Sequence, residues 1–270
     1  MEVGLVLGGG GARCFAQIGV LRAFEERAVT PVAIAACSTA AIIGALYAAG
    51  QRSTSIHKIA SEANLRDFIN LGGSTGLMDQ AGVEALLRPY VPESFEDLAI
   101  PLATVATDVQ RGELIVLRSG PLIPAVCASN AFPGIFSPVR HNGRDLIDGG
   151  VLNLVPVDVI RSLTTRPVIA VDVSLSPRRK LDLDEDVTLW NKITMPFKMK
   201  RLPLFLDLLD KAYTITQSQV TQLRYASYPP EAIIKPDLTD DFKIHDFDCL
   251  EEAVELGYRK ATEVLEQVSF

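Results

Sequence analysis

A serine at a predicted strand-to-helix turn is the first residue whose surroundings suggest chemistry. Ser38 follows the apolar run 31–36 and precedes an Ala-rich segment that favours helix. Such a turn exposes the serine Oγ at a helix N-terminus, where unbonded N–H groups and the helix dipole favour developing negative charge. Serine nucleophiles are built in this way, in the pattern Gly-x-Ser-x-Gly. Serine also caps many helices without doing chemistry, so the turn alone leaves an ordinary N-cap open.

The turn departs from that pattern, because it reads Ala36-Cys37-Ser38-Thr39-Ala40 and alanine replaces both glycines. Alanine is the next smallest side chain, but its Cβ disfavours the positive φ that a strained turn can require. Cys37 lies at a helix N-terminus, which could lower the pKa of its thiol. We expect the Cys37 side chain to point away from the crevice that holds Ser38.

A second motif is the glycine run Gly8 to Gly11, which follows a predicted strand over 3–7 and precedes Arg13 and Cys14. Four glycines leave the backbone N–H groups free to converge on an anion. The two common nucleotide patterns, G-x-G-x-x-G and G-x-x-x-x-G-K-[ST], do not fit. The run therefore predicts an oxyanion-binding loop, with a plain tight turn as the alternative.

A third motif, Asp148-Gly149-Gly150, places a carboxylate at the end of a predicted strand. Taken alone, Asp-Gly is a common turn dipeptide. None of the three histidines occupies a strand end after Ser38, where a triad base would lie. These residues are His57, His141 and His245.

Together the three motifs resemble the patatin-like phospholipase family, particularly its single-domain bacterial serine acyl hydrolases. That family carries a GGGxR oxyanion loop, a G-x-S-x-G nucleophile and a D-G-[GA] aspartate. The resemblance implies an α/β fold, a three-layer sandwich with a mainly parallel central sheet flanked by helices. It also implies a catalytic Ser38–Asp148 dyad and an oxyanion hole made by the N–H groups of Gly9, Gly10 and Gly11.

By the same resemblance, Arg13, Cys37 and Thr39 support the site, and neither a metal nor a cofactor is required. The implied activity is that of a lysophospholipase, phospholipase A or carboxylesterase, with phospholipids, lysophospholipids or other acyl esters as substrates. The departures at Ala36, Ala40 and Cys14 leave a second hypothesis, a protein that binds acyl chains without efficient hydrolysis. A third is a phosphate- or nucleotide-binding module that uses the glycine loop.

Composition limits the classes of function that the chain can have. Its 270 residues carry a net charge of −7, which argues against nucleic acid as a partner. The four cysteines are far apart and fit a reducing cytoplasm without a disulfide framework or zinc site. The predicted strand near the N-terminus leaves no room for a signal peptide. The uncharged stretch 29–50 is long enough to cross a bilayer, but a buried strand, turn and helix explain it better.

We predict one domain over 1–270, with further helices at 55–68, 79–90, 121–129, 203–223 and 248–267 and further strands at 102–107, 113–117, 168–173 and 232–236. Segment 177–201 combines basic and aromatic residues and could act as a lid or contact anionic lipid at a membrane surface. The helix over 203–223 carries an apolar stripe that we expect to face the core. The stripe consists of Phe205, Leu208, Leu209, Ala212, Ile215, Val220 and Leu223.

Overall fold

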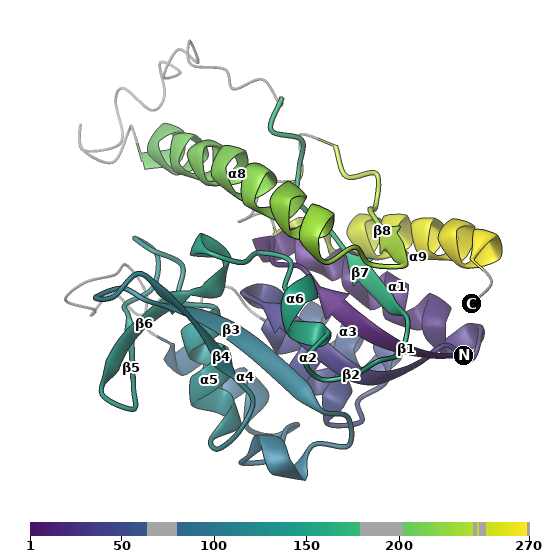
Figure 1. The fold of residues 1–270 in the computed structure, drawn as a ribbon, viewed down its shortest axis with the longest axis horizontal. Helices are drawn as coiled ribbons and strands as arrows, with labels where there is room; N and C mark the ends of the chain where they lie inside the picture. The colour runs from purple at the N-terminus through teal and green to yellow at the C-terminus, as the bar shows by residue number, and fades with distance from the viewer. Residues whose placement is uncertain (64–79, 179–201, 240–241, 243–246, 269–270) are drawn as a thin grey trace.

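The computed structural model describes residues 1–63, 80–178, 202–239, 242 and 247–268 (Figure 1). Its centre is an eight-stranded sheet with the order β5-β6-β3-β2-β1-β7-β8, and β4 pairs with β3 outside this path. The strands are β1 (Glu2–Leu7), β2 (Thr30–Cys37), β3 (Leu102–Asp108), β4 (Glu113–Leu117), β5 (Val139–His141), β6 (Arg144–Asp148), β7 (Val168–Val171) and β8 (Ala232–Ile234).

The five neighbouring strands from β3 to β8 run parallel, while β4, β5 and β6 pair antiparallel. Buried parallel strands are apolar on both faces, and β2 shows this directly. Ile34 and Ala36 pack into the larger core on one face, whereas Ala35 and Cys37 pack into the smaller core on the other. The sheet is therefore covered on both sides.

Helices on the two faces complete three layers, which confirms the predicted α/β architecture. The larger core includes residues of α1 (Phe15–Glu26), α2 (Thr39–Ala48), α3 (Ser53–Glu62), α4 (Ala81–Leu87), α5 (Leu122–Ser129) and α9 (Leu250–Gln267). The opposite face carries α6 (Val157–Ile160) and the long helix α8 (Leu202–Ser227). Figure 1 shows α8 crossing over the molecule, well separated from the strands except near its C-terminal end.

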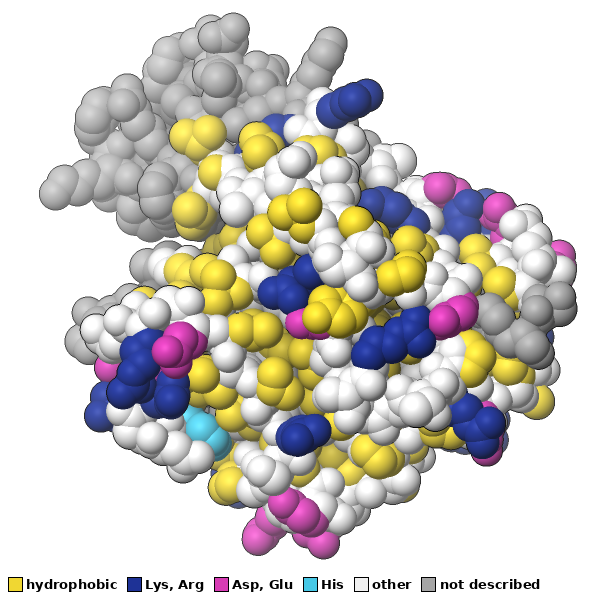
Figure 2. Space-filling view, viewed as in Figure 1, with side chains coloured by type: hydrophobic (Ala, Val, Ile, Leu, Met, Phe, Trp, Pro, Cys, Tyr) yellow, Lys and Arg dark blue, Asp and Glu magenta, His cyan; other side chains and the backbone are white. Residues whose placement is uncertain are grey.

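The predicted orientation of the helix after residue 202 is wrong. Leu208, Ile215 and Leu223 are exposed, the last at 70%, and Figure 2 shows hydrophobic side chains on the outer surface of α8. The buried side of α8 carries Thr214 and Gln217 instead. The expectation failed because it assumed that apolar residues face inward, whereas Gln217 and Arg224 turn towards the segment after Asp148, where they bond to the carbonyls of Val151 and Leu152.

Two of the expected helices are shorter than predicted, since the structure has α3 at Ser53–Glu62 and α4 at Ala81–Leu87. Residues 64–79, between them, lie outside the described ranges, as does most of the expected lid segment 177–201. The uncharged stretch 29–50 forms β2 and α2, as expected. Among the described residues, no helix has both the length and the apolar character needed to cross a bilayer.

Candidate active site

Ser38 occupies the turn between β2 and α2 and carries backbone strain. Its φ of 58° and ψ of −139° lie outside the regions that L-residues favour, at a cost of about 1–3 kcal/mol. Neither Ala36 nor Ala40 has a positive φ, so the strain of the turn falls on the serine itself. The alanines at this turn are therefore compatible with its backbone.

Gly44 of α2 leaves room for the methyl group of Ala36, where the helix packs against the strand. A Cβ placed on Gly44 would lie 3.3 Å from the Ala36 Cβ, which is tighter than most real Cβ contacts. A glycine in the helix thus makes room for the alanine in the strand. The small residue that this crossing requires is present, but on the helix.

Two consecutive residues at the end of α5 hold the turn. The backbone N–H of Ser38 donates to the hydroxyl of Ser129 at 3.0 Å. The hydroxyl of Thr39 donates to Oδ1 of Asn130, also at 3.0 Å. Both bonds come from a helix 91 positions away in sequence, so the geometry of the turn is set by tertiary contacts.

The register of β3 explains how Asp148 reaches the same place. β4 pairs along one edge of β3, and on the other edge β2 and β6 follow one another end to end. The last residue of β2, Cys37, faces Val105, and the last residue of β6, Asp148, faces the next position, Ala106. Because β2 runs parallel and β6 antiparallel to β3, their C-terminal ends meet.

At this junction the Ser38 hydroxyl donates to Oδ2 of Asp148 at 2.6 Å. The other carboxylate oxygen, Oδ1, accepts the Gly150 N–H at 2.7 Å. Asp148 is fully buried, and burial raises its carboxyl pKa to about 6, although the hydrogen bonds from Ser38 and Gly150 oppose this shift. The carboxylate is therefore ionised near neutral pH and is a stronger base than an aspartate in water.

The surroundings of Cys37 favour the protonated thiol over the reactive thiolate. Burial, followed by the nearby negative charge of Asp148, holds the pKa of the Cys37 thiol well above its usual range, so the expected lowering is wrong. Cys37 is absent from the cavity lining, as expected for a side chain that points away from the crevice. Its Sγ nevertheless donates a weak hydrogen bond to Oδ1 of Asp148, at 3.8 Å.

The glycine loop contributes fewer free donors than predicted. The N–H of Gly8 donates to the Val171 carbonyl at 2.9 Å, and the N–H of Gly9 donates to the Leu154 carbonyl at 3.0 Å. Gly9 is thus not available as an oxyanion donor in this structure, because β7 and the segment before α6 already use the loop's first amides. The two remaining glycines, Gly10 and Gly11, line the cavity.

Gly9 instead has a steric role. A Cβ at Gly9 would lie 2.9 Å from the Cβ of Ser38, closer than real Cβ contacts come. Arg13 closes the loop from its other side, since its Nε donates to the Gly10 carbonyl at 3.0 Å. Cys14 is buried, with Sγ 3.7 Å from the Gly8 carbonyl, so its side chain packs beneath the loop.

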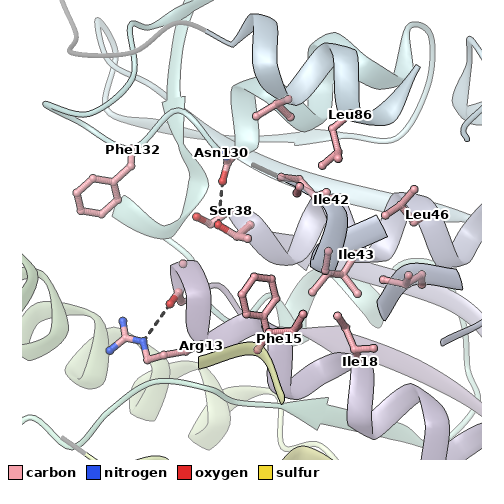
Figure 3. Close-up of a pocket in the computed structure, with 18 of the residues that line it drawn as sticks. Arg13, Phe15, Ile18, Ser38, Ile42, Ile43, Leu46, Leu86, Asn130 and Phe132 are labelled. Carbon is pink, nitrogen blue, oxygen red and sulfur yellow. Dashed lines mark hydrogen bonds between the residues drawn. The ribbon is translucent and has the colours of Figure 1, made fainter. Parts of the chain in front are cut away.

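Ser38 opens into a cavity of about 770 Å³. In Figure 3, Ile18, Ile42 and Leu46 lie on one side of Ser38, and Phe132 lies on the other. The apolar side is enclosed by α1, α2, α3 and α4, and the opposite side is bordered by α8. Asp148 itself does not line the cavity but lies behind Ser38.

Histidine and metal chemistry find no support among the residues described. His57 pairs with Glu251 at the surface, and His141 contacts Asn142. His245 lies outside the described ranges. In the part of the chain that the structure covers, no group of three or more potential ligands could hold a metal ion.

The site also contains side chains that sequence reasoning did not identify. Ser129 and Asn130 hold the turn, and Tyr213 and Gln217 of α8 line the cavity. A Ser-Asn pair at a helix end gives no local sign of a distant partner. Gln217 could have been noticed as a polar position opposite the apolar stripe of α8.

Comparison with known proteins supports the resemblance seen in the sequence. A family model described as patatin-like phospholipase matches residues 5–161. An uncharacterized NTE family protein of Mycobacterium tuberculosis is 35% identical over 177 residues, which cover 64% of this chain and 49% of the relative. A patatin-like phospholipase domain-containing protein of Caenorhabditis elegans is 31% identical over 285 residues, covering 98% of this chain and 21% of the relative.

The human patatin-like phospholipase domain-containing protein 6 is 29% identical over 273 residues, with 95% of this chain and 20% of the relative covered. The chain thus spans about half the length of its mycobacterial relative and about a fifth of the animal ones.

Two solved structures share the fold at low sequence identity. VipD from Legionella pneumophila aligns with a TM-score of 0.59 and 15% identity, covering 98% of this chain and 67% of VipD. The type III effector protein ExoU aligns with a TM-score of 0.50 and 14% identity, over 98% of this chain and 53% of ExoU. These likenesses concern the fold.

Proposed function

The chain belongs to the patatin-like phospholipase family, and from this premise we propose that it is a serine-dependent lipid acyl hydrolase with Ser38 as nucleophile and Asp148 as general base. The observation that carries the proposal is the 2.6 Å hydrogen bond from the Ser38 hydroxyl to Asp148, at the wall of a large cavity. A nucleophile and a base within direct hydrogen-bonding reach are the first requirement of covalent acyl transfer.

In the acylation step, the Ser38 Oγ attacks the ester carbonyl carbon while its proton moves to Oδ2 of Asp148. The tetrahedral intermediate then collapses, the bond to the leaving alcohol breaks, and the protonated Asp148 returns the proton to the alcohol oxygen. A water molecule next attacks the acyl-serine, with Asp148 taking its proton and then returning that proton to Ser38. Raising the carboxyl pKa towards neutrality suits Asp148 to both directions of transfer.

The charge that develops on the carbonyl oxygen needs donors on the cavity side of Ser38. Gly10 and Gly11 line the cavity next to Ser38, and their backbone N–H groups are our proposed oxyanion donors. One such donor is typically worth a factor of about 10²–10³ in turnover. Arg13, through its bond to the Gly10 carbonyl, holds these amides in place.

The apolar side of the cavity supports a long acyl group as the substrate's reactive part. Side chains from four helices line it, including Ile42 and Leu46 on successive turns of α2. Burial of each methylene contributes about 0.8 kcal/mol to binding. Phospholipids, lysophospholipids and simple acyl esters all carry such a group, and they are the proposed substrate classes.

The alternative of a lipid-binding protein without efficient hydrolysis rested on Ala36 and Ala40 of the turn and on Cys14, which packs beneath the glycine loop. Neither Ala36 nor Ala40 has a positive φ, and Gly44 leaves room for the Ala36 methyl group. Both features favour a working nucleophile over an impaired one.

We further propose that the chain acts as one domain in the cytoplasm, with peripheral contact between segment 177–201 and anionic lipid.

Labelling with a fluorophosphonate probe tests the proposal. The probe should modify wild-type protein and not Ser38→Ala, and wild type alone should hydrolyse a nitrophenyl ester of a medium-length fatty acid. Ser55→Ala, a hydroxyl change at a partly exposed position on α3, serves as the matched control and should label normally. Equal labelling and turnover in wild type and Ser38→Ala would contradict the proposal.

A further inference from the structure

One buried polar atom in the cavity wall is not explained by the catalytic groups. Gln217 of α8 is 2% exposed and lines the same cavity as Ser38. Its Nε2 donates to the Val151 carbonyl at 2.8 Å, which determines the orientation of the side-chain amide. The amide oxygen Oε1 is buried and has no hydrogen-bond partner within the described part of the chain. A buried acceptor without a donor is unfavourable, so a ligand that supplies a donor there is favoured.

The bond from Gln217 to Val151 places this acceptor beside the segment that follows Asp148. One turn earlier on α8, Tyr213 lines the cavity and stacks edge-on against Phe132, with ring centroids 5.2 Å apart. The Tyr213 hydroxyl lies so close to Gly150 that a Cβ at this glycine would overlap it. This wall of the cavity is therefore the Asp148 side, opposite the apolar wall formed by α1 and α2.

The chemistry of ester cleavage assigns the two sides of the cavity to the two parts of a substrate. Asp148 must return its proton to the oxygen of the leaving alcohol, so this alcohol lies towards Asp148 and α8. The acyl chain then extends along the apolar side, past Ile42 and Leu46. The unpaired oxygen of Gln217 consequently belongs to the side of the cavity that holds the alcohol part of the substrate.

We propose that Gln217 forms a subsite for the leaving alcohol, in which its Oε1 accepts a hydrogen bond from a second hydroxyl group on that alcohol. The ligand class is a fatty acyl ester of a polyol that retains a free hydroxyl. Gln217 is then a specificity-determining residue, because an alcohol without this hydroxyl leaves the buried oxygen unpaired. The inference rests on the proposed hydrolase function.

Two esters with the same acyl chain test the subsite: glycerol 1-decanoate and propyl decanoate, which differ only in the hydroxyl groups of the three-carbon alcohol. Wild type should prefer the glycerol ester. In Gln217→Leu and Gln217→Met, kcat/KM for the glycerol ester should fall about 10- to 100-fold. The value for the propyl ester should fall much less, and circular dichroism spectra that match wild type report that the variants are folded.

The matched control is Gln219→Leu, which changes an exposed glutamine of the same helix and should keep the wild-type preference. Equal kcat/KM of wild type for the two esters would overturn the subsite, and so would an equal loss on both esters in the Gln217 variants. Wild type that hydrolyses neither ester and is not labelled at Ser38 would instead overturn the proposed function. Turnover of propyl decanoate without any preference therefore separates the two failures.

Discussion

The hydroxyl of Ser129 accepts the backbone N–H of Ser38, 3.0 Å away, and so links the end of α5 to the strained turn that carries the nucleophile. Both side chains are buried, and the two residues lie 91 positions apart in the sequence. The position of the nucleophile thus depends on a second serine that does not contact substrate.

Replacing Ser129 by alanine should slow acylation and leave substrate binding almost unchanged. The Ser38 N–H would lose its acceptor, at a cost of about 1–3 kcal/mol, so kcat should fall roughly 10-fold with little change in KM. The rate of fluorophosphonate labelling should fall in parallel. Ser162→Ala, which removes a hydroxyl bonded to the Val159 carbonyl next to α6, is the control. An unchanged labelling rate in Ser129→Ala would show that the turn holds its shape without this contact.

Activity should depend on the ionisation of Asp148. Burial raises its carboxyl pKa to about 6, and only the ionised form can take the Ser38 proton. As pH falls through 6 the carboxylate becomes protonated, so kcat/KM should decrease about tenfold per pH unit below this value. The measurement is the rate of acid release across the acidic range, with a return to pH 8 as the check for irreversible loss. Full activity retained well below the pKa of Asp148 would contradict its role as base.

The same burial makes Asp148 a destabilising residue at neutral pH. Its folded-state pKa of about 6 exceeds the ordinary aspartate pKa of 3.8, so the folded protein binds more protons than the unfolded chain between these values. Stability is therefore lost as pH rises through this window, by about 3 kcal/mol. Relative to wild type, Asp148→Asn should gain stability as the buffer goes from pH 4 to 8. Denaturant unfolding at both pH values measures this, and a constant difference between the two proteins would refute it.

The depth of the apolar side of the cavity should limit the length of the acyl chain that the protein accepts. Ile42 and Leu46 lie four and eight residues beyond Ser38 on α2, about 6 and 12 Å along the helix axis. For wild type, kcat/KM should rise about fourfold per methylene until the cavity is filled. Ile42→Trp should stop this rise at a shorter chain than Leu46→Trp does.

Nitrophenyl esters of graded length give the profiles, and Phe132→Leu, on the other side of Ser38, is the control that should keep the wild-type limit. If both tryptophan variants retain the wild-type profile, the acyl chain lies elsewhere.

The sequence by itself determined the features that depend only on residues close together in the chain. The apolar strand, the serine turn and the Ala-rich helix follow from residue size and spacing between 30 and 48, and the structure has them as β2, Ser38 and α2. The three motifs together, in their order along the chain, identified the family. The sequence also shows the alanines of the turn, but it does not show that Gly44 leaves room for the methyl group of Ala36.

Only the tertiary structure decided which groups meet. Ser38 and Asp148 come together because β2 and β6 pair with the same edge of β3, and the pairing with β6 begins where the pairing with β2 ends. Strand pairing between segments so far apart in the chain leaves no periodic signal in the sequence. For the same reason the sequence could not show that the Leu154 carbonyl accepts the Gly9 N–H, or that α8 turns Gln217 inward and Leu208 and Leu223 outward. Each of these outcomes depends on the partner that packing brings to a backbone or side-chain group, and that partner lies far away in the chain.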